Sequence, residues 1–386
     1  MATFEDQVAN ALESGFAPGV VAIAKDKEGN LNYSKSFSRK DGPEYNEDTV
    51  MGLASMSKLV TSIAALQVVE RGLITLDDDV TPFLPTLAKQ GVLTGFADNG
   101  EPITRKRQNP ITLRQLLTHS AGLGYTFLHE PLAKVAAWKK LPDPSATVEE
   151  AFDLPLLYEP GEDFMYSASI DWAGKLVEKL TGQNLEDYVR QNIFEPLGME
   201  STTFFPWNRP EIQARRVPMT YREDPAGPVV EKAGEPWFSD GKKEPFGGQG
   251  LFSSMRDYIK VLHSLLVDDE KLLKKETAAL MFQPHLSPKS KAALLEMMKE
   301  PVWLVGDFPI TNEYDWGLGG ILVDGDKHEY RRKGTLIWSG AANLYWFIDR
   351  AAGLCGVFGT QVLPPFDDRI KPLIKAFEDK VYGKAV

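Results

Sequence analysis

The segment Leu53-Ala54-Ser55-Met56-Ser57-Lys58-Leu59-Val60 places a serine and a lysine three positions apart at the start of an apolar helical pattern. The apolar side chains recur at helical spacing until Arg71-Gly72, at Leu59, Ile63, Leu66 and Val69. We therefore predict a helix with Ser55 at its N-terminus. Because residues i and i+3 lie on one helix face, the Lys58 amine can reach the Ser55 hydroxyl and activate it as a nucleophile.

The serine–lysine spacing alone is weak evidence, because Ser239-Asp-Gly-Lys242 repeats it in the same chain. Ser239 lies in a polar segment that no apolar helix follows, so we expect Lys242 to be solvated. For Ser55, the alternative is a serine that merely caps a helix. Other motifs must decide between a cap and a nucleophile.

Two later segments contain groups that fit nucleophilic catalysis. Tyr166 stands just ahead of a helical pattern, and a phenol near a lysine can take the serine proton and return it to a leaving group. Residues 336–342 predict a strand with small residues in its second half, where a backbone N–H could complete an oxyanion hole with that of Ser55. Taken alone, Tyr166 is better explained by packing, and the strand equally well by a bulge or turn.

Strand patterns gather at the two ends of the chain. The first end predicts a hairpin from 20–24 and 31–33, and the last predicts a meander from 319–323, 336–338, 344–348 and 354–358. Amphipathic helices are predicted over 3–14 and 366–382, with Pro372 disturbing the first turn of the second. The middle carries helical spacing at 111–117, 170–180, 188–193 and 258–266.

This order of elements predicts an α+β fold. Residues 1–75 and 310–386 form an antiparallel sheet domain with terminal helices, and residues 76–309 form a mainly helical inserted domain. We expect the active site between the two. At 386 residues the chain is long enough for two such lobes.

Composition excludes several classes of partner. The net charge of -11 gives no reason to bind nucleic acid or an anionic membrane surface. No apolar run approaches the roughly 20 residues of a membrane span, and the start lacks a signal-peptide pattern, so we expect a cytoplasmic protein. The single cysteine, Cys355, excludes an internal disulfide and is expected to be buried in a strand. The five histidines show no ligand spacing, so neither a metal nor another cofactor is expected.

Taken together, Ser55, Lys58, Tyr166-Ser167 and the small-residue strand resemble, in order and spacing, the serine β-lactamase and penicillin-binding superfamily. Further segments look like its class C-like esterase branch and, within it, the fungal statin side-chain acyltransferases that make lovastatin: 116–123, 171–178, 246–253 and 331–334. The resemblance spans nearly the whole chain. It implies a β-lactamase-like fold.

The resemblance also implies roles for individual residues. Ser55 would be the acylated nucleophile, with Lys58 and Tyr166 as its proton-handling partners. The backbone N–H groups of Ser55 and Ala341 would form the oxyanion hole. Substrate-binding positions would be Tyr125, Ser339, Gly340 and Trp346.

Two departures from the β-lactamase pattern bear on the substrate. Tyr166-Ser167-Ala168 lacks the amide that would orient an acylamino side chain. Trp338-Ser339-Gly340 replaces Lys-Thr-Gly, which removes the cation that would hold a β-lactam or peptide carboxylate. An apolar ester or thioester therefore fits better.

We accordingly predict a serine acyltransferase that moves an acyl group from a thioester (of coenzyme A or an acyl carrier protein) or an ester to a hydroxyl of a bulky secondary metabolite. An esterase using the same site is the alternative, because only the access of water or alcohol to the acyl-enzyme separates the two. A β-lactamase or carboxypeptidase fits less well, because those enzymes act outside the cytoplasm. Whether Lys58 or Tyr166 is the resting base is open.

Overall fold

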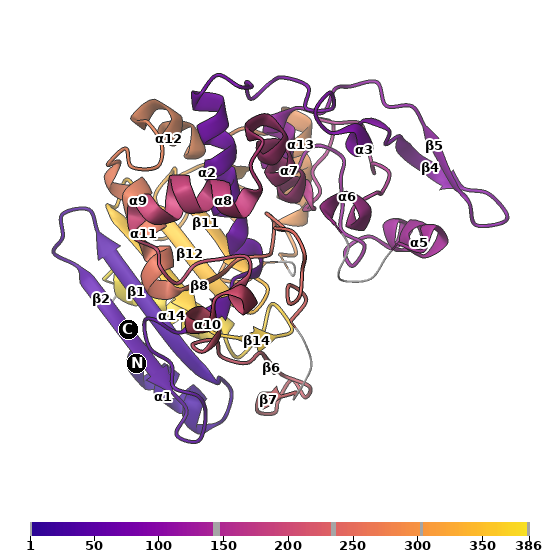
Figure 1. Ribbon diagram of the computed structural model, residues 1–386. Helices are drawn as coiled ribbons and strands as arrows, with labels where there is room; N and C mark the ends of the chain where they lie inside the picture. The colour runs from indigo at the N-terminus through magenta and orange to yellow at the C-terminus, as the bar shows by residue number, and fades with distance from the viewer. Residues whose placement is uncertain (1, 142–146, 233–236, 302–303, 384–386) are drawn as a thin grey trace.

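Strands from both ends of the chain form one antiparallel sheet, as the sequence predicts (Figure 1). The computed structural model describes residues 2–141, 147–232, 237–301 and 304–383. Within those ranges the sheet has seven strands in the order β2-β1-β13-β12-β11-β10-β9. Their bounds are β1 Gly19–Asp26, β2 Asn32–Ser38, β9 Tyr314–Trp316, β10 Ile321–Val323, β11 Leu336–Gly340, β12 Leu344–Asp349 and β13 Leu354–Gly359. The two ends of the chain meet where β1 pairs with β13.

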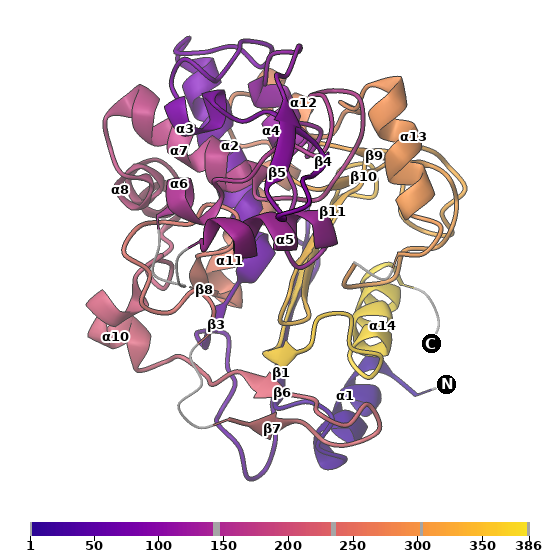
Figure 2. The same cartoon turned by 90° about the vertical axis from the view of Figure 1, so that its right-hand side faces the viewer.

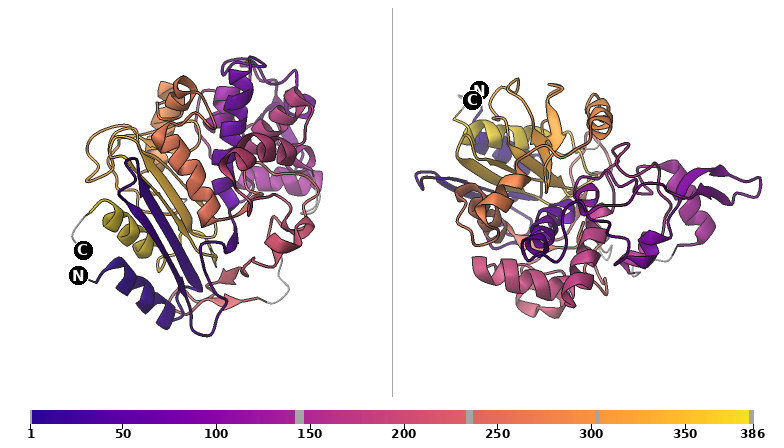
Figure 3. Two further views of the ribbon diagram at one scale, coloured as in Figure 1. Left: turned by 60° about the vertical axis from the view of Figure 1, so that its left-hand side comes forward. Right: turned by 90° about the horizontal axis from the view of Figure 1, so that it is seen from above.

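Helices cover both faces of this sheet (Figure 2, Figure 3). The terminal helices α1 (Phe4–Glu13) and α14 (Lys371–Val381) pack together on one face, and α11 (Met255–Val267) packs on the other. Because both faces are covered, the inner strands β11 and β12 are buried along their whole length. Cys355 is buried in β13, as expected.

The last helix begins later than its apolar pattern predicts. Position 366 precedes the helix, which starts at Lys371. Pro372 then stands in the first turn, where a missing backbone N–H costs no helical hydrogen bond. The proline therefore sets the start of α14.

The middle of the chain is largely helical, as predicted. Its other helices are α3 Pro85–Ala88, α4 Leu113–Leu117, α5 Glu130–Lys139, α6 Val148–Ala151, α7 Ser169–Thr181, α8 Leu185–Val189, α9 Glu195–Leu197, α10 Pro210–Gln213, α12 Lys275–Met281 and α13 Pro288–Met297. Short strands accompany them: β3 Val50–Gly52, β4 Val92–Phe96, β5 Pro102–Arg105, β6 Thr220–Tyr221, β7 Val230–Glu231, β8 Phe252–Ser254 and β14 Val362–Leu363. None of the described helices is both long and apolar enough to cross a membrane.

The sheet layer and the helical layer are interleaved along the chain. Helix α2 (Ser57–Glu70) comes from the N-terminal part but packs against α7 of the middle, whereas α11 comes from the middle but packs on the sheet. Residues 57–68 of α2 are all buried, which is typical of a helix enclosed on all sides. The domain boundaries at 75/76 and 309/310 therefore stay predictions.

Arg331 ties the C-terminal helix to the sheet. From the loop between β10 and β11, its guanidinium donates to both carboxylate oxygens of Glu378 in α14, at 2.9 and 2.5 Å. It also donates to the Tyr345 hydroxyl of β12 at 2.9 Å. Both charged side chains are fully buried, so each depends on the other for its stability in the interior.

Replacing Arg331 should destabilise the fold strongly. Arg331→Met leaves the Glu378 carboxylate buried without a cation, which should lower the free energy of unfolding by about 3–5 kcal/mol. Urea unfolding followed by circular dichroism measures this. The control is Lys380→Met on the same helix, which removes a partly exposed ion pair with Glu5 and should cost less than about 1 kcal/mol. Equal midpoints for the two variants would refute the role of Arg331.

Candidate active site

Ser55 stands in a tight turn between the sheet and α2. The 3₁₀ turn η1 (Ala54–Met56) leads directly into the helix, and Ala54 has φ 47°, a left-handed conformation that a residue with a Cβ rarely adopts. Such strain persists only where the surroundings hold it. The Ser57 hydroxyl donates to the Ala54 carbonyl at 2.7 Å, and the Tyr258 hydroxyl donates to that of Met56 at 2.8 Å.

Strand β11 approaches this turn closely. A Cβ at Gly340 would lie 2.3 Å from the carbonyl oxygen of Leu53, so only glycine allows the two backbones to come this near. Ala341 follows directly and lines the same pockets as Ser55. The assignment of the Ser55 and Ala341 N–H groups to an oxyanion hole stays a prediction, which this proximity supports.

Lys58 lies one turn along α2, beneath the serine. Its amine nitrogen lies 3.1 Å from the Ser55 Oγ and donates to the Gly248 carbonyl at 2.7 Å and the Tyr125 hydroxyl at 3.2 Å. The side chain is only 2% exposed. Burial lowers the pKa of Lys58 to about 7, although the charge of Asp171 opposes this shift.

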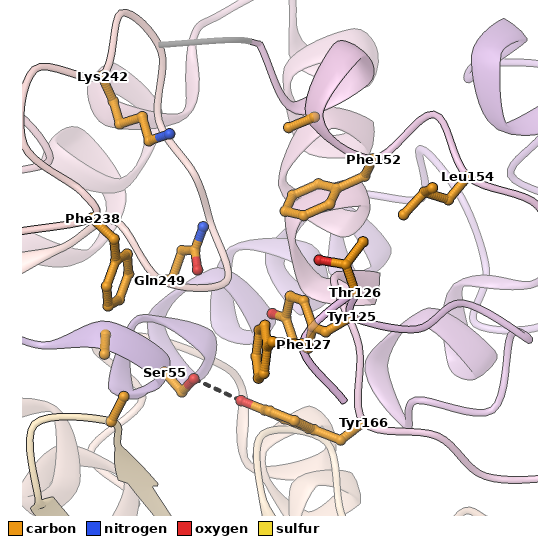
Figure 4. A pocket seen from close by; sticks show the side chains of 13 residues that line it. Ser55, Tyr125, Thr126, Phe127, Phe152, Leu154, Tyr166, Phe238, Lys242 and Gln249 are labelled. Carbon is orange, nitrogen blue, oxygen red and sulfur yellow. Dashed lines mark hydrogen bonds between the residues drawn. The ribbon is translucent and has the colours of Figure 1, made fainter. Parts of the chain in front are cut away.

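Tyr166 is the second side chain that reaches Ser55 (Figure 4). Its hydroxyl donates to the Ser55 Oγ at 2.6 Å. Burial raises the pKa of this phenol, so Tyr166 is protonated at neutral pH. His119 packs against the Tyr166 ring at 4.7 Å between centroids, and its Nδ1 accepts the Ser167 N–H at 3.2 Å. The structure thus brings together Ser55, Lys58 and Tyr166 as the sequence predicts.

Among the described residues, two pockets meet at Ser55 and share Phe127, Tyr166 and Ala341. The Lys242 pocket has a volume of about 410 Å³ and is also lined by Ala54, Tyr125, Thr126, Ala151, Phe152, Leu154, Phe238, Lys242 and Gln249 (Figure 4). The Trp338 pocket has a volume of about 280 Å³ and is also lined by Leu128, Val305, Trp338, Ser339, Gly340, Pro365 and Phe366. Both walls are mainly apolar, so each pocket suits a hydrophobic group.

The predicted substrate-binding residues do not all lie in one pocket. Tyr125 lines the Lys242 pocket, and Ser339 and Gly340 line the Trp338 pocket. Trp346 lines neither, because it is completely buried on β12. Its cross-strand neighbour on β11, Trp338, is the indole that reaches the pocket. The expectation for Trp346 is therefore corrected in favour of Trp338.

Lys242 also departs from expectation, because it is not simply solvated. Its side chain is half-buried and lines the larger pocket, with the amine turned inward and 4.7 Å from the centroid of the Phe246 ring (Figure 4). Ser239, its partner in the repeated motif, is buried and donates to the Gln249 carbonyl at 3.1 Å. The segment is therefore part of the pocket wall, although it lacks the helix that presents Ser55.

Sequence reasoning also missed Asp171, which is buried at 1% exposure in the first turn of α7. Its Oδ1 accepts the N–H of Gly248, the residue whose carbonyl accepts from Lys58. The available signal was an acidic residue among the apolar positions of a predicted helix. Burial holds the pKa of Asp171 up at about 6, whereas the charge of Lys58 lowers it.

Comparisons with known proteins agree with this geometry. The family model described as Beta-lactamase matches residues 4–378. Monacolin J acid methylbutanoyltransferase of Aspergillus terreus is 40% identical over 97% of this chain and 94% of its own. Lovastatin esterase of Penicillium rubens is 39% identical over 97% of this chain and 96% of its own.

A solved structure of simvastatin synthase from Aspergillus terreus, in a mutant form, superposes with a TM-score of 0.92. It is 40% identical and covers 99% of this chain and 94% of its own. The α+β fold and the resemblance seen in the sequence are thereby confirmed. The chain belongs to the beta-lactamase family.

Proposed function

We propose that this enzyme is an acyltransferase that carries the acyl group on Ser55 and passes it to a hydroxyl of a bulky metabolite. One observation carries the proposal: the Ser55 Oγ lies within hydrogen-bond distance of the Lys58 amine and the Tyr166 hydroxyl, at the meeting point of two apolar pockets. The relatives named as methylbutanoyltransferases support transfer of a small branched acyl group.

Lys58 is the resting base in this mechanism. The Tyr166 hydroxyl already donates a hydrogen bond to the Ser55 Oγ, and the raised pKa of Tyr166 keeps this hydroxyl protonated. The uncharged amine of Lys58 has two N–H donors for Gly248 and Tyr125 and one lone pair for Ser55. The proton of Ser55 therefore passes to Lys58.

The reaction then proceeds in two balanced halves. The Ser55 Oγ attacks the acyl carbon, its proton moves to Lys58, and negative charge develops on the carbonyl oxygen. Tyr166 protonates the departing sulfur or oxygen as the old bond breaks, and Lys58 reprotonates Tyr166. In the second half the acceptor hydroxyl attacks the acyl-enzyme by the same steps in reverse.

The two pockets suit the two parts of the product. We assign the smaller Trp338 pocket to the acyl group and the larger Lys242 pocket to the acceptor. Relatives named for monacolin J acid and for ML-236A carboxylate act on acceptors that carry a carboxylate, which the inward amine of Lys242 would bind. A thioester donor on coenzyme A or a carrier protein, and a cytoplasmic location, remain part of this proposal.

Hydrolysis is the second candidate, favoured by the 39% identity to lovastatin esterase. The same acyl-enzyme gives either outcome. What differs is whether water or an alcohol reaches it in the Lys242 pocket.

Acylation should occur at Ser55 alone. Incubation with a short branched acyl thioester should add one acyl mass, located on Ser55 by peptide mass spectrometry, and added alcohols should divert the acyl group from water. Ser62→Ala in α2 is the matched control that keeps the adduct, since its buried hydroxyl has no hydrogen-bond partner among the described residues. A full-mass adduct on Ser55→Ala would refute the nucleophile. If the acyl group passes only to water with every alcohol tried, the result contradicts acyl transfer and supports hydrolysis.

The acylation rate should rise with pH through about 7 and then level off. The pKa of Lys58 is lowered to about 7, so below that pH the amine is protonated and cannot accept the Ser55 proton. Stopped-flow acylation from about pH 5 to about pH 9 measures the midpoint. Lys58→Met should abolish acylation across this range. A rate independent of pH would remove Lys58 as the base.

Lys242 should select acceptors that carry a carboxylate. Lys242→Gln should reduce kcat/KM about tenfold for a carboxylate acceptor and leave its methyl ester nearly unchanged, because one charged hydrogen bond contributes about 1.5 kcal/mol. The neighbouring exposed Lys243→Gln is the matched control and should change neither substrate. Equal losses for the acid and the ester would contradict the assignment.

A further inference from the structure

We propose that Asp171 is a positioning residue, which holds the Lys58 amine in place through the backbone of Gly248 and places a buried carboxylate next to that backbone. The inference rests on the proposed role of Lys58 as the base. It assigns a task to a buried carboxylate that does not touch the reacting atoms.

A continuous chain of hydrogen bonds joins the two side chains. The Lys58 amine donates to the Gly248 carbonyl at 2.7 Å, and the Gly248 N–H donates to the Asp171 Oδ1 at 2.9 Å. Glycine at position 248 permits this approach, because a Cβ there would lie 2.3 Å from the Asp171 Oδ2. The carboxylate therefore lies directly against Gly248, the residue whose carbonyl accepts from Lys58.

A purely structural role explains this carboxylate poorly. Within the described residues, Asp171 Oδ2 is buried and has no hydrogen-bond partner, and burying a charge in this way is costly. An asparagine could accept the same N–H from Gly248 without a charge. The loop also has a second, neutral tether, because the Thr61 hydroxyl donates to the Gly247 carbonyl at 2.7 Å. The charge of Asp171 is thus superfluous for holding the loop.

The surroundings explain what the charge does. Of the residues that the structure describes, the titratable groups around the Lys58 amine are Tyr125, Tyr166, His119 and Asp171, and the last is the anion among them. Lys242 is the other cation that acts on Asp171. Burial favours the neutral amine, whereas the Asp171 carboxylate favours the ammonium. Asp171 therefore opposes burial and keeps the pKa of Lys58 near neutrality.

An intermediate pKa suits a group that must both accept and return a proton. Without the negative charge, burial would act alone and the pKa of Lys58 would fall. The amine would then stay neutral at lower pH but would be a weaker base. The lower pKa favours the reaction at low pH, because it lowers the pH midpoint, whereas the weaker base lowers the maximal rate. One pH–rate profile measures both effects.

The test compares Asp171→Asn with Asp257→Asn in the full chain. Asp257 is also buried, but its carboxylate accepts from the Ser201 N–H and the Thr202 hydroxyl and pairs with Lys260. Asp171→Asn should move the midpoint of the acylation rate about one pH unit lower and reduce the plateau rate about three- to tenfold. Asp257→Asn should leave the midpoint where it is in the unchanged protein.

Asp171→Ser provides the same reading if the amide is not tolerated, since the smaller hydroxyl keeps a hydrogen-bond acceptor beside Gly248. A folded neutral variant that retains the original midpoint would overturn the inference. That result is distinct from failure of the proposed function, which would appear as no Ser55 adduct, or no pH midpoint, in the unchanged protein. A midpoint that moves upward would also overturn it, because removing an anion cannot stabilise the ammonium.

Discussion

Burial of the Lys58 amine is the constraint on which the site depends. An amine in the interior must satisfy its hydrogen-bonding capacity there, and the groups that do so come from segments far apart in the chain. Ser55 comes from the turn before α2, Tyr125 from the loop after α4, and Gly248 from the loop before β8. These loops can meet only around a helix enclosed on all sides, and α2 is such a helix.

The same burial divides the chemistry between the two partners of Ser55. It lowers the pKa of the lysine and raises that of Tyr166, so near neutral pH the amine can accept the Ser55 proton while the phenol keeps its own. Burial alone accounts for the direction of both pKa shifts. The same apolar surroundings lower the pKa of the cationic acid and raise the pKa of the neutral acid. Ser55 contacts both groups and can therefore exchange protons with both.

The sequence reveals features that depend on local pattern. Helix α2 with Ser55 and Lys58, the hairpin β1–β2 and the meander β10–β13 follow from periodicity and turn residues, and Tyr166 follows from its order relative to them. Lys242 and Trp346 could not be placed in this way. Whether a loop lysine points into a cavity, and which of two paired indoles reaches it, depends on how distant segments pack. In the proposed mechanism the cation comes from another loop and lies in the Lys242 pocket, whereas residues 338–340 of β11 line the Trp338 pocket.

The pairing of β1 with β13 also governs when the enzyme can become active during its synthesis. Val21 lies opposite Gly359, and the strand beside the nucleophile, β11, begins only at Leu336. Ser55 and Lys58 are therefore made long before the sheet that supports them can close. Because pairing over such sequence distances is slow and needs both partners, a nascent chain holds its nucleophile in an unfinished site. The order of the chain thus places completion of the Ser55 site after the synthesis of the last strands of the sheet.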